Sequence, residues 1–152
     1  MGVGGARVIV LELSEVEVGL LRTLLAEYDE LVQADDGDPV LDRLFPVAYR
    51  DDPDAAAEFA KYTRSGLVDH KTANAGALSA ALADGGLVRL DTESAERWLP
   101  VLTDLRLIVA ERIGITADDD PVPDDPLGEV YHWLGNLQSY LIDALDALED
   151  RA

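Results

Sequence analysis

Only a few side chains in this sequence have the type and spacing that could support chemistry. Glu129 and His132 are three residues apart, so in a helix the carboxylate and the imidazole share one face, as the ligands of carboxylate-bridged di-iron bundles do. Such sites need a second Glu-x-x-His motif, but the other histidine, His70, has Leu67 three residues before it. The motif alone therefore predicts no metal, and a histidine satisfied by hydrogen bonds is the simpler interpretation.

Two charged residues, Asp104 and Arg106, interrupt an otherwise apolar run from Leu99 to Ile108. A helix that is apolar all round is normally buried, and a buried charge must be paired. We expect each of the two to find an opposite charge or a helix-end carbonyl inside the protein, with contact to a ligand or a partner as the alternative. If Asp104 met Glu129 and His132 in one cavity, the chain could instead be a metal- or small-ligand-binding enzyme built on a helical bundle.

Other reactive centres are missing from the sequence. The chain has no cysteine, so it cannot carry a disulfide, a thiolate metal site or a thiol nucleophile. It contains no nucleophile elbow, phosphate-binding loop or dinucleotide fingerprint. The Asp clusters at 35–38 and 118–125 lack the ligand spacing of an EF-hand loop, which favours solvated acidic loops. We therefore predict no catalytic residue and no cofactor.

The charge of the chain restricts its partners. The 152 residues include 12 Lys and Arg against 31 Asp and Glu, which gives a formal net charge of -19. Binding to nucleic acid or to an anionic membrane is disfavoured, because both need Lys and Arg to neutralise phosphate. The only basic concentration comprises Arg50, Lys61, Arg64 and Lys71. No targeting signal and no apolar stretch of about 20 residues is present, so we expect a cytoplasmic protein with a basic protein partner.

Hydrophobic periodicity predicts a mainly α-helical single domain over residues 1–152. Helical stripes dominate, and two short β-branched or apolar runs near 7–13 and 87–90 read as strands that pair in a small two-stranded β ribbon. Ser14 and Glu17 have capping-box spacing, which predicts a helix start. Residues 1–5 are expected to be a frayed N-terminus, and 114–126 an acidic Asp/Pro loop.

The final helix carries the most regular apolar stripe in the chain. Its members follow one another in steps of three and four residues: Leu127, Val130, Leu134, Leu137, Leu141, Ala144 and Leu148. Such a seam calls for a helical partner, either within the bundle or on a second subunit of a homodimer. Trp98 and Trp133 lie on apolar stripes, which makes them candidate core anchors with an interface role as the alternative.

Several segments together resemble a known family. They are residues 42–49 followed by Asp51 and Asp52, then Trp98 and Leu99 with residues 102–107, and residues 131–134 with Leu137 and Gln138. In order and spacing they resemble a small, mostly actinobacterial family catalogued as a domain of unknown function (DUF2017), which includes proteins described as oxidative-stress-response regulators. The resemblance implies a mainly helical, cytoplasmic, non-enzymatic protein that binds other proteins, such as the transcription machinery through a sigma factor. Oxidant sensing in that family depends on paired cysteines, which this chain lacks.

Taken together, these observations predict a regulatory protein-interaction module. Its partner would be a sigma factor or another basic protein. The candidate partner-binding residues are Trp98, Asp104, Arg106, Tyr131, His132 and Trp133.

Overall fold

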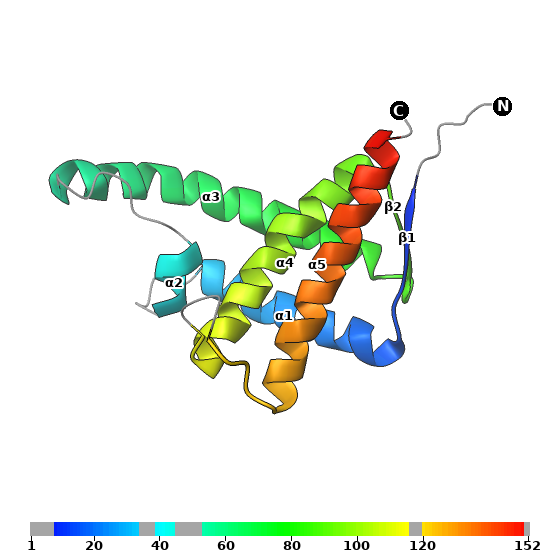
Figure 1. Ribbon diagram of the computed structural model, residues 1–152. Coiled ribbons are helices and arrows are strands. Elements are labelled where there is room, and N and C mark those ends of the chain that lie inside the picture. Colours follow the sequence, from blue (N-terminus) through cyan, green and yellow to red (C-terminus); the bar gives the residue numbers. More distant parts are fainter. Residues whose placement is uncertain (1–7, 34–38, 45–52, 116–119, 151–152) are drawn as a thin grey trace.

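The computed structural model describes residues 8–33, 39–44, 53–115 and 120–150. Across these ranges the elements are β1 (Ile9–Glu12), α1 (Glu15–Gln33), α2 (Pro39–Leu44), α3 (Pro53–Ala81), β2 (Leu87–Leu90), α4 (Thr92–Ile113) and α5 (Pro126–Asp150). Figure 1 shows α4 and α5 side by side in opposite directions, with α1 and α3 crossing behind them and the ribbon beside α5. The predicted mainly α architecture with a small β ribbon is confirmed.

Local hydrogen bonds explain where the helices begin and end. At the start of α1, the amide of Ser14 donates to Glu17 Oε1 at 2.8 Å, and the amide of Glu17 donates to Ser14 Oγ at 3.1 Å. The predicted capping box is thus confirmed. Asp91 caps α4 by accepting from the Ser94 amide at 2.8 Å, and Gly114 ends it with a left-handed φ of 82°.

The ribbon packs one face on the core. Strand β1 pairs antiparallel with β2, from Ile9 opposite Leu90 to Glu12 opposite Leu87. Buried and exposed residues alternate along both strands, because successive side chains point to opposite faces. The residues that face inward are therefore Ile9, Leu11, Val88 and Leu90, which belong to the same core as the helices.

Two glycines form the turn that leads into β2. Gly85 has a φ of 107°, a conformation that L side chains rarely adopt. At Gly86 a Cβ atom would lie 1.9 Å from the carbonyl oxygen of Leu13. This close approach allows the Leu13 amide to donate to the Gly86 carbonyl at 2.8 Å, which extends the pairing beyond the end of β1.

The apolar seam of α5 packs against α4 within the same chain. Its buried members are Leu134, Leu137 and Leu141, and Leu145 beside the seam is buried with them. On α4 the buried residues include Val101, Leu102, Leu105, Ile108 and Val109. Of the two helical partners considered for the seam, the one within the bundle is present.

The observed boundaries refine the sequence prediction at several points. The strand predicted over 7–13 spans only Ile9–Glu12, and the predicted frayed segment 1–5 lies outside the described residues. Part of the predicted loop 114–126, residues 116–119, also lies outside them. Ile115 is buried, so the start of this loop joins the core. None of the described helices is both long and apolar enough to span a membrane.

Candidate functional site

Asp104 joins three helices in the protein interior. Its Oδ2 atom accepts a hydrogen bond from the Tyr28 hydroxyl of α1 and another from the Lys71 ammonium group of α3, each at 2.6 Å. The expectation that Asp104 finds an opposite charge inside the protein is confirmed. Burial first, and the bond to Asp104 second, raise the pKa of Tyr28, so its hydroxyl remains a donor.

Two of the six candidate partner-binding residues, Trp98 and Asp104, lie in the interior. Asp104 is buried among α1, α3 and α4, and Trp98 is 1% exposed in the core. Both lie on the inward face of α4, because the helical stripe that contains them packs against the other helices. Trp98 and Asp104 therefore pack within the bundle in this structure.

The metal-site constellation does not assemble. Glu129 and His132 are exposed on α5, whereas Asp104 is buried and already bonded to Tyr28 and Lys71. No group of three or more His, Asp and Glu side chains that could hold a metal ion occurs among the described residues. The helical-bundle enzyme that we considered from the sequence required these three groups in one cavity, and they do not share one.

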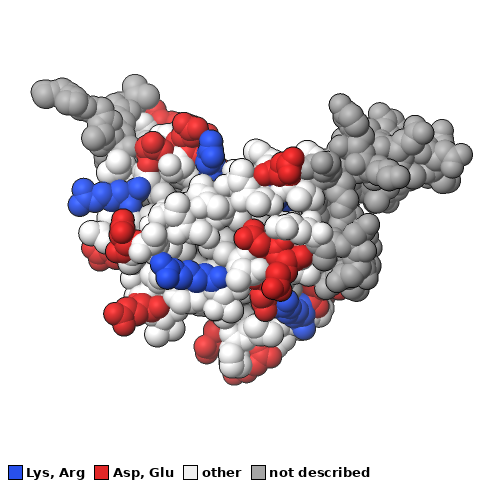
Figure 2. Space-filling model, turned by 180° about the vertical axis from the view of Figure 1, so that it is seen from behind, with Lys and Arg blue, Asp and Glu red and all other residues white. Residues whose placement is uncertain are grey.

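Basic side chains are scattered over the described surface. Figure 2 shows Lys and Arg on the rear face lying singly among Asp and Glu. Of the predicted basic concentration, Lys71 is bonded to Asp104, and the side chains of Arg50, Lys61 and Arg64 lie outside those that the structure describes. The visible face therefore presents no continuous basic patch of the kind that binds a phosphate backbone.

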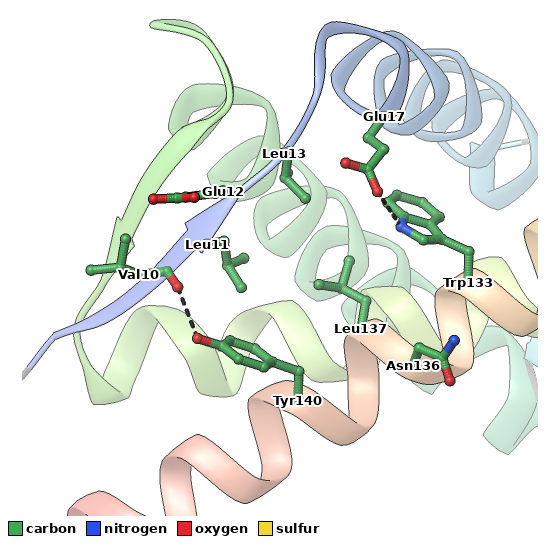
Figure 3. A pocket seen from close by; sticks show the side chains of 9 residues that line it. All are labelled: Val10, Leu11, Glu12, Leu13, Glu17, Trp133, Asn136, Leu137 and Tyr140. Carbon is green, nitrogen blue, oxygen red and sulfur yellow. Dashed lines mark hydrogen bonds between the residues drawn. The ribbon is translucent and has the colours of Figure 1, made fainter.

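A groove of about 500 Å³ lies between β1 and α5. Its walls are residues 10–13 on one side, with Glu17 at the start of α1, and Trp133, Asn136, Leu137 and Tyr140 on the other. In Figure 3, Leu11 of β1 and Leu13 just after it point toward Leu137 and Trp133 of α5, whereas Val10 and Glu12 extend to the other side of β1. Glu12 and Glu17 are the only charged residues among the described residues that line it. The groove is therefore apolar with a negative rim.

Two long-range hydrogen bonds hold the walls of this groove in place (Figure 3). The indole Nε1 of Trp133 donates to Glu17 Oε2 at 2.6 Å, and the Tyr140 hydroxyl donates to the Val10 carbonyl at 3.0 Å. The bond from the Ser14 amide, and to a lesser extent the one from Trp133, lowers the pKa of Glu17. The carboxylate is thus ionised at neutral pH while it fixes the indole.

One edge of β1 faces this groove. The Leu13 amide donates toward β2, and the Val10 carbonyl accepts from Tyr140 on the opposite side. Backbone groups alternate along an antiparallel strand, so Ile9 and Leu11 direct their amides to β2, whereas Val10 and Glu12 direct theirs away from it. An edge of this kind is a template for a further strand.

The remaining candidate residues lie on α5 and beside it. Trp133 lines the groove, whereas Arg106 and His132 line a second pocket that shares Asn136 with it. The guanidinium carbon of Arg106 lies 4.2 Å from the centroid of the Tyr131 ring, so Tyr131 positions Arg106. Three of the six residues, Trp133, Arg106 and His132, are thus divided between two adjacent pockets. Tyr131 lies against Arg106, and the other two are in the core.

Sequence reasoning missed several residues of the groove. Glu17 was identified only as a helix cap, and Glu12, Val10 and Tyr140 were not singled out as site residues. Tyr140 reaches β1 across 130 positions of sequence, a contact that no local pattern encodes. Only the exposed aromatic ring at the edge of an apolar stripe could have drawn attention to it.

Comparison with known proteins identifies one family. The family model described as "Domain of unknown function (DUF2017)" matches residues 2–145. This match covers nearly the whole chain and includes both pockets. No curated protein and no solved structure matches the chain.

Proposed function

From the premise that this chain belongs to the DUF2017 family, we propose that it is a non-enzymatic protein-interaction module whose docking site is the groove between β1 and α5. The observation that carries the proposal is the accessible edge of β1 beside an apolar wall of α5. Strand addition to such an edge combines backbone hydrogen bonds with side-chain pockets, and it is a common way to bind extended peptides.

The chemistry of the groove selects the partner. Glu12 and Glu17 line it and no Lys or Arg does so in the described part of the chain, so an extended segment with basic side chains complements it. The net charge of -19 also favours fast encounter with a basic protein at low ionic strength. We propose a regulatory role in the cytoplasm, with a sigma factor as the partner that the family resemblance implies.

The apolar wall supports the same proposal. Tyr140 is half exposed and Val10 is 40% exposed. A docked partner would therefore remove more of their apolar surface from water, which favours binding. Trp133 is held by Glu17 instead of being free to rotate, and a fixed aromatic side chain binds with a smaller entropic cost. Aromatic residues of this kind are the usual energetic centres of interfaces.

The proposal can be tested with a short synthetic peptide of alternating Lys and Val. We expect saturable amide shifts at residues 10–13 and at the Trp133 indole in the isotope-labelled protein. Glu12→Lys should weaken binding about tenfold or more, because a lysine from the protein would then face those of the peptide. Glu12 is exposed and shows no hydrogen bond or ion pair in the structure, so the fold should tolerate the change.

Glu30→Lys is the matched control. Glu30 is exposed on α1, outside the groove, and its substitution changes the net charge by the same amount. We expect it to alter the affinity less than twofold at equal ionic strength. Equal weakening by both variants would mean that the peptide responds only to overall charge, and absence of shifts at 10–13 would reject the docking site.

A further inference from the structure

Arg106 extends from α4 onto the surface of α5. Its guanidinium carbon lies 4.2 Å from the centroid of the Tyr131 ring. One turn further along α5 it meets Gly135, where a Cβ atom would lie only 3.2 to 3.3 Å from the guanidinium atoms. The absent side chain at Gly135 thus leaves the space that the guanidinium occupies, and the ring of Tyr131 fixes its orientation.

Unlike most described cations, Arg106 lacks an anionic partner. Arg43, Lys71, Arg97 and Arg112 each have a carboxylate oxygen within 4.0 Å. Across the described ranges no carboxylate lies that close to Arg106, and its buried Nε atom makes no hydrogen bond. We expected Arg106 to find an opposite charge or a helix-end carbonyl inside the protein, and among the described residues it finds neither. Among the described cations, the feature that singles out Arg106 is its buried nitrogen atom without a hydrogen bond.

A pocket of about 380 Å³ opens beside the guanidinium. Its polar lining consists of Arg106, His132, Asn136, Gln138 and Ser139. No Asp or Glu occurs among the described residues that line it, although the chain contains 31 of them. Amide, hydroxyl, imidazole and guanidinium groups can all donate hydrogen bonds, so the lining suits an acceptor with several oxygen atoms.

We propose that this pocket binds an oxyanion group, carboxylate or phosphate, of a small ligand. Arginine binds such groups through two parallel N–H···O bonds, and its flat guanidinium is already held in one orientation here by Tyr131 and Gly135. The volume lies within the range of about 300 to 1,000 Å³ that is usual for small-molecule sites. The overall negative charge of the protein repels an anionic ligand at long range, but salt screens this repulsion beyond about 10 Å at moderate ionic strength.

The test follows the side-chain signals of the intact chain in solution. Inorganic phosphate, succinate and sodium chloride are titrated separately at equal ionic strength, and the Nε–H resonance of Arg106 and the ring resonances of His132 are recorded. We expect saturable shifts with phosphate, with succinate or with both, and none with chloride. The first two titrations also distinguish a phosphate site from a carboxylate site.

Matched variants assign the binding to the guanidinium. Arg106→Gln should weaken binding about tenfold to a hundredfold, the value of a hydrogen bond to a charged group. Gly135→Ala should weaken it by displacing the guanidinium. Arg97→Gln removes the same charge from an exposed position on α4 that is paired with Glu93, so it should have little effect. Circular dichroism spectra and melting curves verify that each variant is folded.

Two results would overturn the proposal. One is the absence of saturable shifts with both anions, and the other is equal loss of binding in Arg106→Gln and Arg97→Gln. Because the oxyanion pocket does not include the β1 edge, its failure leaves the peptide experiment on the groove unaffected, and the two inferences can fail separately.

Discussion

Trp133 of α5 donates its indole hydrogen to Glu17 at the start of α1, across 116 positions of sequence and at 2.6 Å. The same carboxylate accepts the Ser14 amide, so one side chain both begins a helix and fixes an aromatic wall of the groove. A helix cap therefore shapes the candidate docking site. Several measurable consequences follow from this and from the other contacts.

The pH dependence of stability should reveal the role of Glu17. Its pKa is lower in the folded protein than its ordinary value of 4.5, so its stabilising contribution is present above pH 4.5 and is lost as the pH falls through the lowered folded value. We expect Glu17→Gln to reduce the free energy of unfolding by about 1 kcal/mol at neutral pH. Urea unfolding of both proteins at several pH values measures the difference.

The difference in unfolding free energy between wild type and Glu17→Gln should shrink at low pH, as the Glu17 carboxylate of the wild type becomes protonated. Glu30→Gln on the same helix is the control, since Glu30 is exposed and caps nothing. A difference between wild type and Glu17→Gln that stays constant from neutral to strongly acidic pH would contradict the assignment.

The buried Lys71–Asp104 pair should matter far more than an exposed one. Lys71→Met leaves a buried carboxylate with only the Tyr28 hydroxyl, which should cost about 3 to 5 kcal/mol of unfolding free energy. In Arg97→Met the lost partner, Glu93, is 77% exposed, so we expect a change within about 0.5 kcal/mol. Denaturant unfolding compares the two, and equal effects would show that the buried pair is not structural.

Alkaline titration should identify Tyr28 as a tyrosine that stays protonated. Its pKa is raised above its ordinary value of 10.0, so its neutral form stabilises the fold below that pH and this contribution is lost as the pH rises through the higher folded value. The ultraviolet absorbance change between about pH 9 and 11 should have the same amplitude in wild type and Tyr28→Phe. A larger amplitude in the folded wild type would mean that Tyr28 ionises freely.

Two glycines should respond in opposite directions to alanine. Gly86→Ala places a Cβ atom against the Leu13 carbonyl, which should destabilise the ribbon by about 1 to 3 kcal/mol. At Gly76, within α3, a Cβ atom meets nothing within 4 Å, so alanine should stabilise the helix by up to about 1 kcal/mol. Thermal melting of the two variants separates these cases, and stabilisation by both would refute the close approach at Gly86.

Much of the fold could be predicted because its signals are local. Helical stripes, the Ser14–Glu17 capping box and the apolar runs that form β1 and β2 all act within a few residues of sequence. The sequence could predict that Asp104 has a partner, because a buried charge must be paired. Its actual partners could not, because Tyr28 and Lys71 are 76 and 33 positions away.

The groove and the pocket beside Arg106 depend on tertiary packing, so the sequence could not predict them, nor that Arg106 has no anionic partner among the described residues. Asp104 and Arg106 are two positions apart, about 200° around a helix, so one faces the core and the other faces α5. Sequence alone treats them alike. The space for the Arg106 side chain comes from Gly135 on a different helix, and the groove exists only because α5 lies beside the edge of β1.

Hydrogen exchange at the edge of β1 tests the docking account most directly. In the free protein the amides of Val10 and Glu12 point away from β2, whereas those of Ile9 and Leu11 point toward it. With saturating Lys-Val peptide, we predict that exchange at Val10 and Glu12 slows at least about tenfold while exchange at Ile9 and Leu11 changes little. Peptide binding that leaves the exchange rates of Val10 and Glu12 unchanged would contradict strand addition at this groove.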